Sequence, residues 1–245
     1  MSKKLILITG ANQGLGYFAA KHFAASGTYH VLLASRDLQK GQQAVDKLVL
    51  EGSSKEALEA IQLDVTSDDS IAKAVETIER KHARLDILVH NAGISVARPD
   101  ATLREEYQTV YNTNVFGPEA LTEAALPLLR KSTLPGGKRI IFVSSSLGTI
   151  EFAADSKHPY NGKLYKVYRS SKSALNMVMA CVGSTLEDEG FVVGAMCPGY
   201  CGTNLNGYAG PKDPSDGAKV IVLAVEAGKD RVHKKVIHEE GAYPW

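Results

Sequence analysis

Short apolar runs alternate with amphipathic stretches along the chain. Apolar runs of strand length predict strands, and apolar residues at helical spacing predict helices. The predicted strands are Leu5–Thr9, His30–Ala34, Leu58–Leu63, Asp86–His90, Arg139–Ser144, Val192–Cys197 and Lys235–His238. The predicted helices begin near Leu15, Gln39, Asp68, Leu103, Val115, Lys166 and Ser215. Strands that alternate with helices indicate an α/β fold with a parallel sheet.

The predicted strands are continuously apolar, as in "DILVH" and "RIIFV", and such strands are covered by helices on both sides. No linker, repeat or low-complexity tract divides the sequence. We therefore expect residues 1–245 to form a single Rossmann-type doubly wound domain, with about seven parallel strands and helices on both faces.

Two segments, 148–164 and 199–214, carry glycine, proline and asparagine without helical or strand periodicity. Each follows a predicted strand, so each lies at the carboxyl edge of the sheet, where open α/β sheets bind ligands. We expect active-site loops here; two ordinary surface loops are the alternative.

The stretch "TGANQGLG" joins the first predicted strand to the first helix and contains Gly10, Gly14 and Gly16. Glycine permits a tight turn and the close approach of a ligand. A helix N-terminus aimed at the turn attracts phosphate. The pattern predicts a nucleotide-binding turn, although an ordinary glycine-rich turn would look similar.

The end of the second strand, "HVLLASRD", bears on the choice of nucleotide. In dinucleotide-binding folds this position lies beside the adenosine ribose, where an acid selects NAD and an arginine accommodates NADP. Ser35 leaves room, and Arg36 offers a fork of donors to a phosphate. If the strand ended one residue later, Asp37 would stand beside the ribose and favour NAD. At the start of the next helix, however, Asp37 fits an N-cap. We therefore expect NADP(H).

The stretch "YRSSK" places Tyr168 and Lys172 four residues apart on one face of a predicted helix. A nearby ammonium lowers the pKa of a tyrosine, as general acid–base chemistry requires. Four residues after Tyr165 stands Arg169, which cannot shuttle protons. Tyr168 is therefore the predicted acid or base.

Asn114 lies inside a predicted helix, although asparagine is a poor helix former. The functional interpretation is a bent helix that exposes a carbonyl to hold water; the alternative is a local hydrogen bond back to the helix. The serines of "FVSSSLG" follow a buried strand at the ligand edge.

Composition narrows the function classes. The 245 residues include 44% hydrophobic and 22% charged residues, with a net charge of +1. This balance argues against nucleic-acid and membrane-surface binding. No apolar run has the length of a membrane span, and the start lacks the features of a signal peptide, so a cytoplasmic location is expected. The three cysteines form neither a metal-binding pair nor a disulfide framework, no metal site is expected, and Cys181 is expected to be buried in a helix.

Over essentially its whole length the sequence resembles the short-chain dehydrogenase/reductase family. The matching motifs are "TGANQGLG" (Thr9–Gly16), "LDV" (Leu63–Val65), "NAG" (Asn91–Gly93), Asn114, the serine after "FVS", "YRSSK" (Tyr168–Lys172) and "PGYCGT" (Pro198–Thr203). Within the family it looks most like the NADPH-dependent carbonyl reductases, with "LLASRDLQKGQQAV" as the strongest local similarity.

The resemblance implies a role for each matching residue. Tyr168 would be the acid or base, Lys172 its tuner and a ligand of the nicotinamide ribose, and Asn114 part of a water relay. The family's spacing to Gly148 selects Ser145 as the residue that holds the substrate oxygen. The implied cofactor-binding residues are Gly10, Asn12, Gln13, Gly14, Leu15, Gly16, Ser35, Arg36, Asp64, Val65, Asn91, Ala92, Gly93, Tyr168, Lys172, Pro198, Gly199 and Thr203.

Three departures from the family pattern stand out. His90 replaces a common asparagine and is interpreted as a packing substitution. Gln13 stands where NADPH users often carry a basic residue. The 22 residues between Ser145 and Tyr168 exceed the usual dozen or so, which predicts a reshaped substrate mouth and leaves a homo-oligomer possible.

The sequence thus predicts a reductase that transfers hydride from NADPH to a small ketone or aldehyde. A cofactor-binding sensor or interaction module without turnover is the main alternative. The intact serine–tyrosine–lysine set argues against it, because binding alone does not require that set. Dehydrogenation or epimerisation at the same site is a second alternative.

Overall fold

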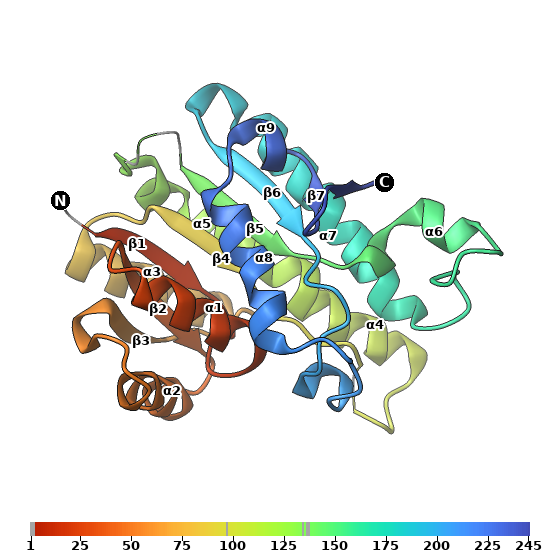
Figure 1. Ribbon diagram of the computed structural model, residues 1–245, viewed down its shortest axis with the longest axis horizontal. Coiled ribbons are helices and arrows are strands. Elements are labelled where there is room, and N and C mark those ends of the chain that lie inside the picture. The colour runs from red at the N-terminus through yellow and green to blue at the C-terminus, as the bar shows by residue number, and fades with distance from the viewer. Residues whose placement is uncertain (1–2, 97, 134, 136–137) are drawn as a thin grey trace.

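The computed structural model describes residues 3–96, 98–133, 135 and 138–245, and within them eight strands form one sheet (Figure 1). Their order is β3-β2-β1-β4-β5-β6-β7-β8. The strands are β1 (Lys4–Ile8), β2 (Tyr29–Ser35), β3 (Leu58–Gln62), β4 (Ile87–His90), β5 (Arg139–Val143), β6 (Val192–Met196), β7 (Val236–Ile237) and β8 (Ala242–Tyr243). All neighbouring pairs are parallel except β7 and β8, which are antiparallel. The predicted parallel sheet of about seven strands is confirmed, with β8 as a short addition.

Nine α-helices lie within the described residues, and the seven that the sequence predicted begin within two residues of their predicted starts. They are α1 (Gly14–Ala25), α2 (Leu38–Leu50), α3 (Asp68–His82), α4 (Leu103–Tyr111), α5 (Gly117–Arg130), α6 (Ile150–Ala154), α7 (Lys166–Thr185), α8 (Pro214–Glu226) and α9 (Lys229–Val232). The sequence did not predict α6 and α9, because helices this short show no periodicity. Within the described residues, every helix is too short or too polar to traverse a membrane.

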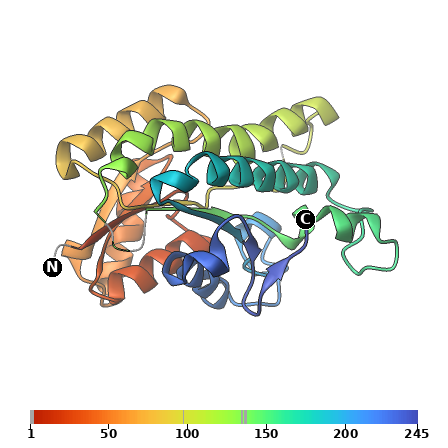
Figure 2. The same ribbon diagram turned by 90° about the horizontal axis from the view of Figure 1, so that it is seen from above.

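Helices cover both faces of the sheet, as Figure 2 shows, with α3, α5 and α7 on one face and α1, α2 and α8 on the other. Alternate residues of β1 point to opposite cores: Leu5 and Leu7 pack beneath the first set of helices, and Ile6 and Ile8 beneath the second. Burial on both faces explains why the strands read as continuous apolar runs.

The segment between Ser145 and Tyr168 extends away from the sheet and contains α6 (Figure 1). It was expected to be without helical structure, but it includes this five-residue helix. Arg169 in α7 is buried and donates to the carbonyl oxygens of Tyr160 (2.6 Å) and Asn161 (3.1 Å). This arginine therefore ties the extension to the body of the protein.

Cys181 corrects one expectation. Its thiol is exposed, whereas the sequence predicted a buried one. Met179 and Val182 of α7 face the core, and at 100° per residue Cys181 falls on the opposite side. A helical pattern alone did not distinguish these faces.

His90 occupies the end of β4 and is only 2% exposed. Its ring stacks on Phe142 with 4.6 Å between ring centroids. The Thr122 hydroxyl donates to the Pro118 carbonyl, so it accepts from His90 Nε2 at 2.8 Å. Burial lowers the pKa of His90 to about 3. The imidazole is therefore a neutral packing group, in line with the interpretation from the sequence.

This burial predicts a pH-dependent stability. In the unfolded chain histidine titrates near pH 6.5, whereas folding keeps His90 neutral down to about pH 3. Protonation of the unfolded chain therefore lowers the free energy of unfolding as the pH falls from about 6.5 toward 3. Between pH 7 and pH 5 the loss is about 2 kcal/mol. His90→Asn cannot titrate, so its free energy of unfolding should fall by about 2 kcal/mol less than that of the wild type over this interval. Urea unfolding at both pH values measures this, and equal losses in the two proteins would contradict it.

Candidate active site

The glycine turn between β1 and α1 is fastened to the end of β4. Gly10 and Gly14 have φ of +61° and +58°, in the left-handed region that favours glycine. The Asn91 side-chain amide donates to the carbonyl oxygens of Thr9 (2.8 Å) and Gly10 (3.2 Å). Thr9 Oγ1 in return accepts from the backbone N–H groups of Asn91 and Ala92, each at 2.9 Å. Two segments of the predicted cofactor site are thereby joined.

The turn fits a phosphate group. A Cβ on Gly16 would lie 2.8 Å from Ala11 Cα, so only glycine allows α1 to pack this closely on the turn. The first turn of α1 contains no acidic residue, and its N-cap residue Gln13 makes no side-chain cap within the described part of the chain. The first N–H groups of α1, at Gly14, Leu15 and Gly16, are thus available to an anion. Asn12 lies half-buried in the same turn.

The end of β2 matches the position predicted for the adenosine ribose. The strand ends at Ser35, which is buried, and Arg36 follows with an exposed side chain. Asp37 is the N-cap of α2, and its carboxylate accepts from the Lys40 N–H at 3.2 Å. The alternative acidic residue therefore already has a structural partner.

Asp64 and Val65 follow β3. The Asp64 carboxylate accepts from the backbone N–H (2.9 Å) and the hydroxyl (2.7 Å) of Thr66. Val65 is buried, and a Cβ on Gly117 would lie only 2.4 Å from its carbonyl oxygen. These contacts fix the backbone of a segment that the family resemblance assigns to cofactor binding.

Helix α7 carries Tyr168 and Lys172 to the end of β5. Lys172 Nζ donates to the Val143 carbonyl at 2.9 Å. The segment after β5 packs directly on α7, because a Cβ on Gly148 would lie 2.9 Å from Lys172. Ser145 lies in this segment, close enough to Tyr168 to lower the pKa of its hydroxyl. The structure therefore brings together the three residues that the family resemblance selected.

The neighbouring serines have other partners. The Ser144 hydroxyl is buried and donates to Asn176 Oδ1 at 2.6 Å. The backbone N–H of Ser146 donates to Cys197 Sγ at 3.2 Å. Of the three serines, Ser145 is the one that acts on the pKa of Tyr168.

The direction of the pKa shift at Tyr168 differs from the one that the sequence predicted. Tyr168 is half-buried, and burial raises the pKa of its hydroxyl. Cys197 adds to the rise, and Ser145 opposes it. Burial also lowers the pKa of Lys172 to about 8. The sequence predicted that the ammonium would lower the pKa of Tyr168, but in this enclosed site the loss of hydration outweighs that attraction.

Asn114 is fully buried in a π-helical segment, Asn112–Phe116, between α4 and α5. Its Oδ1 accepts from the Ile94 N–H at 2.9 Å, and its Nδ2 donates to the Ile94 carbonyl at 2.8 Å. Nδ2 also donates to Ser171 Oγ at 3.0 Å. The side chain therefore does not bond back to its own helix; it joins the end of β4 to α7.

Gly93 lies between the two halves of the site. A Cβ there would be 3.3 Å from Asn114 Oδ1 and 3.6 Å from Lys172 Nζ. The absence of a side chain thus keeps the approach to both polar groups open.

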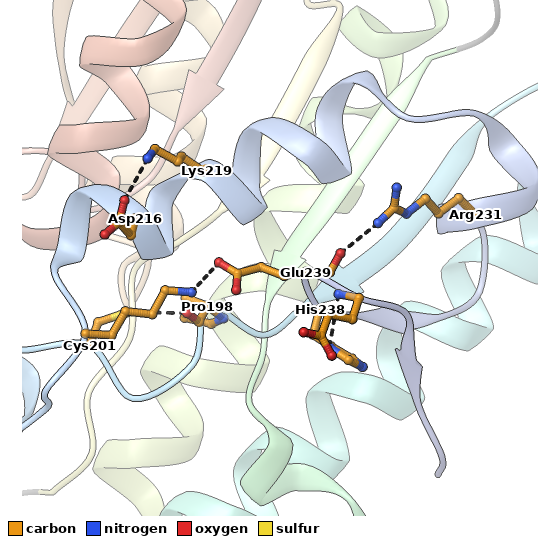
Figure 3. A network of polar contacts seen from close by, with 9 residues as sticks. Pro198, Cys201, Asp216, Lys219, Arg231, His238 and Glu239 are labelled. Atoms are coloured by element: carbon orange, nitrogen blue, oxygen red, sulfur yellow. Dashed lines mark hydrogen bonds and ion pairs between the residues drawn. The ribbon is translucent and has the colours of Figure 1, made fainter.

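The loop 199–214 is tied at its base and near its tip. Gly199 has φ of +84°, and the backbone N–H of Gly202 donates to the Lys212 carbonyl at 2.9 Å. The Lys212 ammonium pairs with the Glu239 carboxylate, while Arg231 donates to the Glu239 carbonyl at 2.9 Å (Figure 3). On the far side, the Ser95 hydroxyl donates to the Leu205 carbonyl at 2.8 Å. The loop therefore connects the C-terminal segment with the end of β4.

Thr203 and Pro198 place the start of this loop beside the glycine turn. The Thr203 methyl group lies 3.7 Å from the position of a Cβ on Gly14. A Cβ on Gly217 of α8 would lie 2.9 Å from the Leu15 side chain and 3.3 Å from Pro198. The predicted cofactor-binding residues of the first and last motifs are thus neighbours, although nearly the whole chain separates them.

Cys197 and Tyr243, to which the sequence assigned no role, lie beside the site. Cys197 is buried, and burial raises the pKa of Tyr243, with the nearby Cys197 adding to the rise. The Tyr243 ring stacks on His238 with 4.4 Å between centroids and meets Phe152 edge-on at 5.7 Å. The C-terminal stretch "GAYPW" has no periodicity, so nothing in the sequence pointed to this position.

Comparison with known proteins assigns the fold and site to one family. The family model described as "short chain dehydrogenase" matches residues 4–214. The chain belongs to the short-chain dehydrogenase family. A short-chain dehydrogenase, anuI, from Penicillium roqueforti is 41% identical over 244 residues, covering 98% of this chain and 96% of the relative.

Carbonyl reductases are among the relatives within the short-chain dehydrogenase family. "Carbonyl reductase [NADPH] 1" from Mus musculus is 26% identical over 282 residues, covering 100% of this chain and 99% of the relative. The crystal structure of an NADPH-bound carbonyl reductase from chicken fatty liver superposes with a TM-score of 0.83 at 25% identity, with all of both chains covered. The resemblance to this family and to its carbonyl reductases is confirmed, and the protein is a family oxidoreductase of a type that uses nicotinamide cofactors.

Proposed function

We propose that this short-chain dehydrogenase is an NADPH-dependent reductase of ketones or aldehydes in small molecules, with Tyr168 as its general acid. The observation that carries the proposal is the convergence of Ser145, Tyr168 and Lys172 at the edge of the sheet that also holds the glycine turn. A protein that only binds a nucleotide has no need for a serine and a tyrosine gathered beside a buried lysine at this edge.

Each residue of the set has a distinct task. The nicotinamide supplies the hydride. Tyr168 stays protonated because burial raises its pKa, so it can give a proton to the substrate oxygen. Ser145 donates a hydrogen bond to the same oxygen, and this bond strengthens as negative charge develops there. Lys172, with a pKa of about 8, holds the nicotinamide ribose and supplies positive charge near Tyr168.

The raised pKa of Tyr168 supports reduction as the working direction. Oxidation of an alcohol needs a tyrosinate to accept the proton, and burial disfavours that form. Asn114 contributes by holding the end of β4 against α7, and we propose that its π-helical segment completes a water relay from Lys172.

The preference for NADPH is supported by Arg36 and Asp37. Arg36 is exposed beside the end of β2, where a 2′-phosphate would lie, whereas Asp37 is engaged as a helix cap. Ser35 is small enough to leave room between them. The relative from Mus musculus and the structure from chicken both carry NADPH in their names.

The substrate mouth favours a large, partly aromatic carbonyl compound. Phe152 of α6 stacks on His158 with 4.0 Å between centroids, and Tyr243 closes the same cluster. Tyr200 and Tyr208 of the loop 199–214 are exposed.

A single domain over 1–245, a cytoplasmic location and a homo-oligomer remain predictions.

Tyr168→Phe tests the assigned acid. The variant deletes the transferable proton and keeps the ring, so kcat for carbonyl reduction should fall by at least about 100-fold, while the dissociation constant of NADPH stays nearly unchanged. Tyr165→Phe is the matched control, because Tyr165 is exposed at the N-terminus of the same helix, and its kcat should be near that of the wild type. NADPH oxidation at steady state and NADPH titration give the two quantities. Turnover above a few per cent in Tyr168→Phe would overturn the assignment.

Arg36→Ala tests the cofactor preference. Loss of the guanidinium should weaken NADPH binding by about 1–3 kcal/mol, the worth of a charged hydrogen bond. NADH lacks the 2′-phosphate, so its affinity serves as the internal control and should change little. Titration calorimetry with both cofactors measures the difference. An unchanged affinity for NADPH would mean that other residues hold the 2′-phosphate.

A further inference from the structure

Two histidines and a glutamate meet at the amino-terminal edge of the sheet, opposite the candidate active site. His30 is the second residue of β2, Glu59 the second residue of β3, and His82 the last residue of α3. His82 Nε2 lies 2.9 Å and His30 Nε2 3.6 Å from Glu59 Oε2. One donor atom from each residue lies within 4.8 Å of the other two. The three residues are separated by 29 and 23 positions along the chain, so they form no motif that the sequence analysis could identify.

The tautomer of His30 points its free nitrogen at the carboxylate. His30 Nδ1 is 2.9 Å from the Glu56 carbonyl oxygen, and because that oxygen only accepts, Nδ1 carries a proton. His30 Nε2 is buried and has no hydrogen-bond partner among the described residues. A histidine that donates one ring N–H to a backbone carbonyl presents the other nitrogen as an oriented metal ligand.

A cation is needed between these groups. The Glu59 carboxylate pairs with the Lys81 ammonium through Oε1, and its Oε2 lies between His82 Nε2 and His30 Nε2. In the neutral tautomer, the lone pair of His30 Nε2 faces this negative oxygen, and the two repel each other. The end of α3 adds the negative pole of a helix dipole at His82. Either a proton or a metal ion relieves the repulsion.

The spacing suits zinc. Zinc binds imidazole nitrogen and carboxylate oxygen at about 2.0–2.2 Å in a tetrahedron, which sets ligand atoms roughly 3.3–3.5 Å apart. The observed 2.9 and 3.6 Å bracket that value. The three side chains are 20–24% exposed, which leaves access for a water as fourth ligand. Lys81 occupies Glu59 Oε1, so Glu59 would bind through Oε2 alone.

We infer that His30, Glu59 and His82 form a binding site for a divalent transition-metal ion, with zinc as the ion that fits the donor set best. The ion links the edge strand β3 and the end of α3 to β2. Because the site lies at the opposite end of the strands from Tyr168, the bound ion stabilises the fold and leaves the reaction unaffected. The ammonium of Lys81 beside Glu59 opposes the positive ion, so the affinity is weaker than that of an all-cysteine structural zinc site.

The test uses the full chain, freed of metal by chelator and dialysis, and titrated with ZnCl2. Calorimetry should show one equivalent bound. At a zinc concentration roughly 100-fold above the dissociation constant, the melting temperature should rise by about 5–10 °C. Cobalt(II) should give the visible absorption of a tetrahedral site.

Single variants identify the ligands. His30→Gln, Glu59→Gln and His82→Gln should each weaken zinc binding at least about 10-fold and abolish most of the thermal shift. His22→Gln, in the last turn of α1, is the matched control and should bind like the wild type. Circular dichroism of the metal-free variants checks that each one folds, and His82→Gln, at an exposed helix end, provides a second ligand variant if His30→Gln does not. One equivalent of zinc bound with unchanged affinity by folded His30→Gln and His82→Gln, or no binding by the wild type, would overturn the site.

Discussion

The parallel sheet is the constraint on which the rest of the structure depends. Because parallel strands end at the same edge, loops from distant parts of the chain meet there. The Thr9–Asn91 hydrogen bonds couple the turn after β1 to the end of β4, and Lys172 bonds the last carbonyl of β5. Asn114 then joins the end of β4 to α7. The proposed cofactor-binding and catalytic groups are therefore held by the backbone ends of neighbouring strands, rather than by long flexible segments.

Burial of the proposed catalytic groups has a direct chemical consequence. The same loss of hydration raises the pKa of Tyr168 and lowers that of Lys172 to about 8, so at neutral pH the tyrosine is neutral and the lysine remains mostly charged. A neutral tyrosine beside Ser145 is a proton donor, which is the form that carbonyl reduction needs. The π-helical segment at Asn114 and Tyr243, at the end of the short strand β8, add further contacts. Burial, more than the tyrosine–lysine spacing, sets the proton chemistry of this site.

The sequence predicted the strands and long helices because burial on both faces and helical periodicity leave clear patterns. It also identified Asp37 as a cap, because the end of β2 could be located to within a residue. It did not predict α6, the exposure of Cys181 or the contact between Cys197 and Tyr243, since these depend on short elements and on packing between distant segments. The sign of the pKa change at Tyr168 was missed for a related reason: spacing shows which groups are near each other, and only the fold shows how much water remains around them.

The most direct test of the account is to follow the hydride. The purified protein is mixed with NADPH that carries deuterium at the donating C4 position and with a panel of ketones and aldehydes, and the products are analysed by mass spectrometry and NMR. The account predicts NADPH oxidation that depends on the carbonyl compound, with one deuterium on the former carbonyl carbon and a solvent-derived proton on its oxygen. Tight binding of NADPH without oxidation by any carbonyl in the panel would contradict it and would favour a cofactor-binding module without turnover.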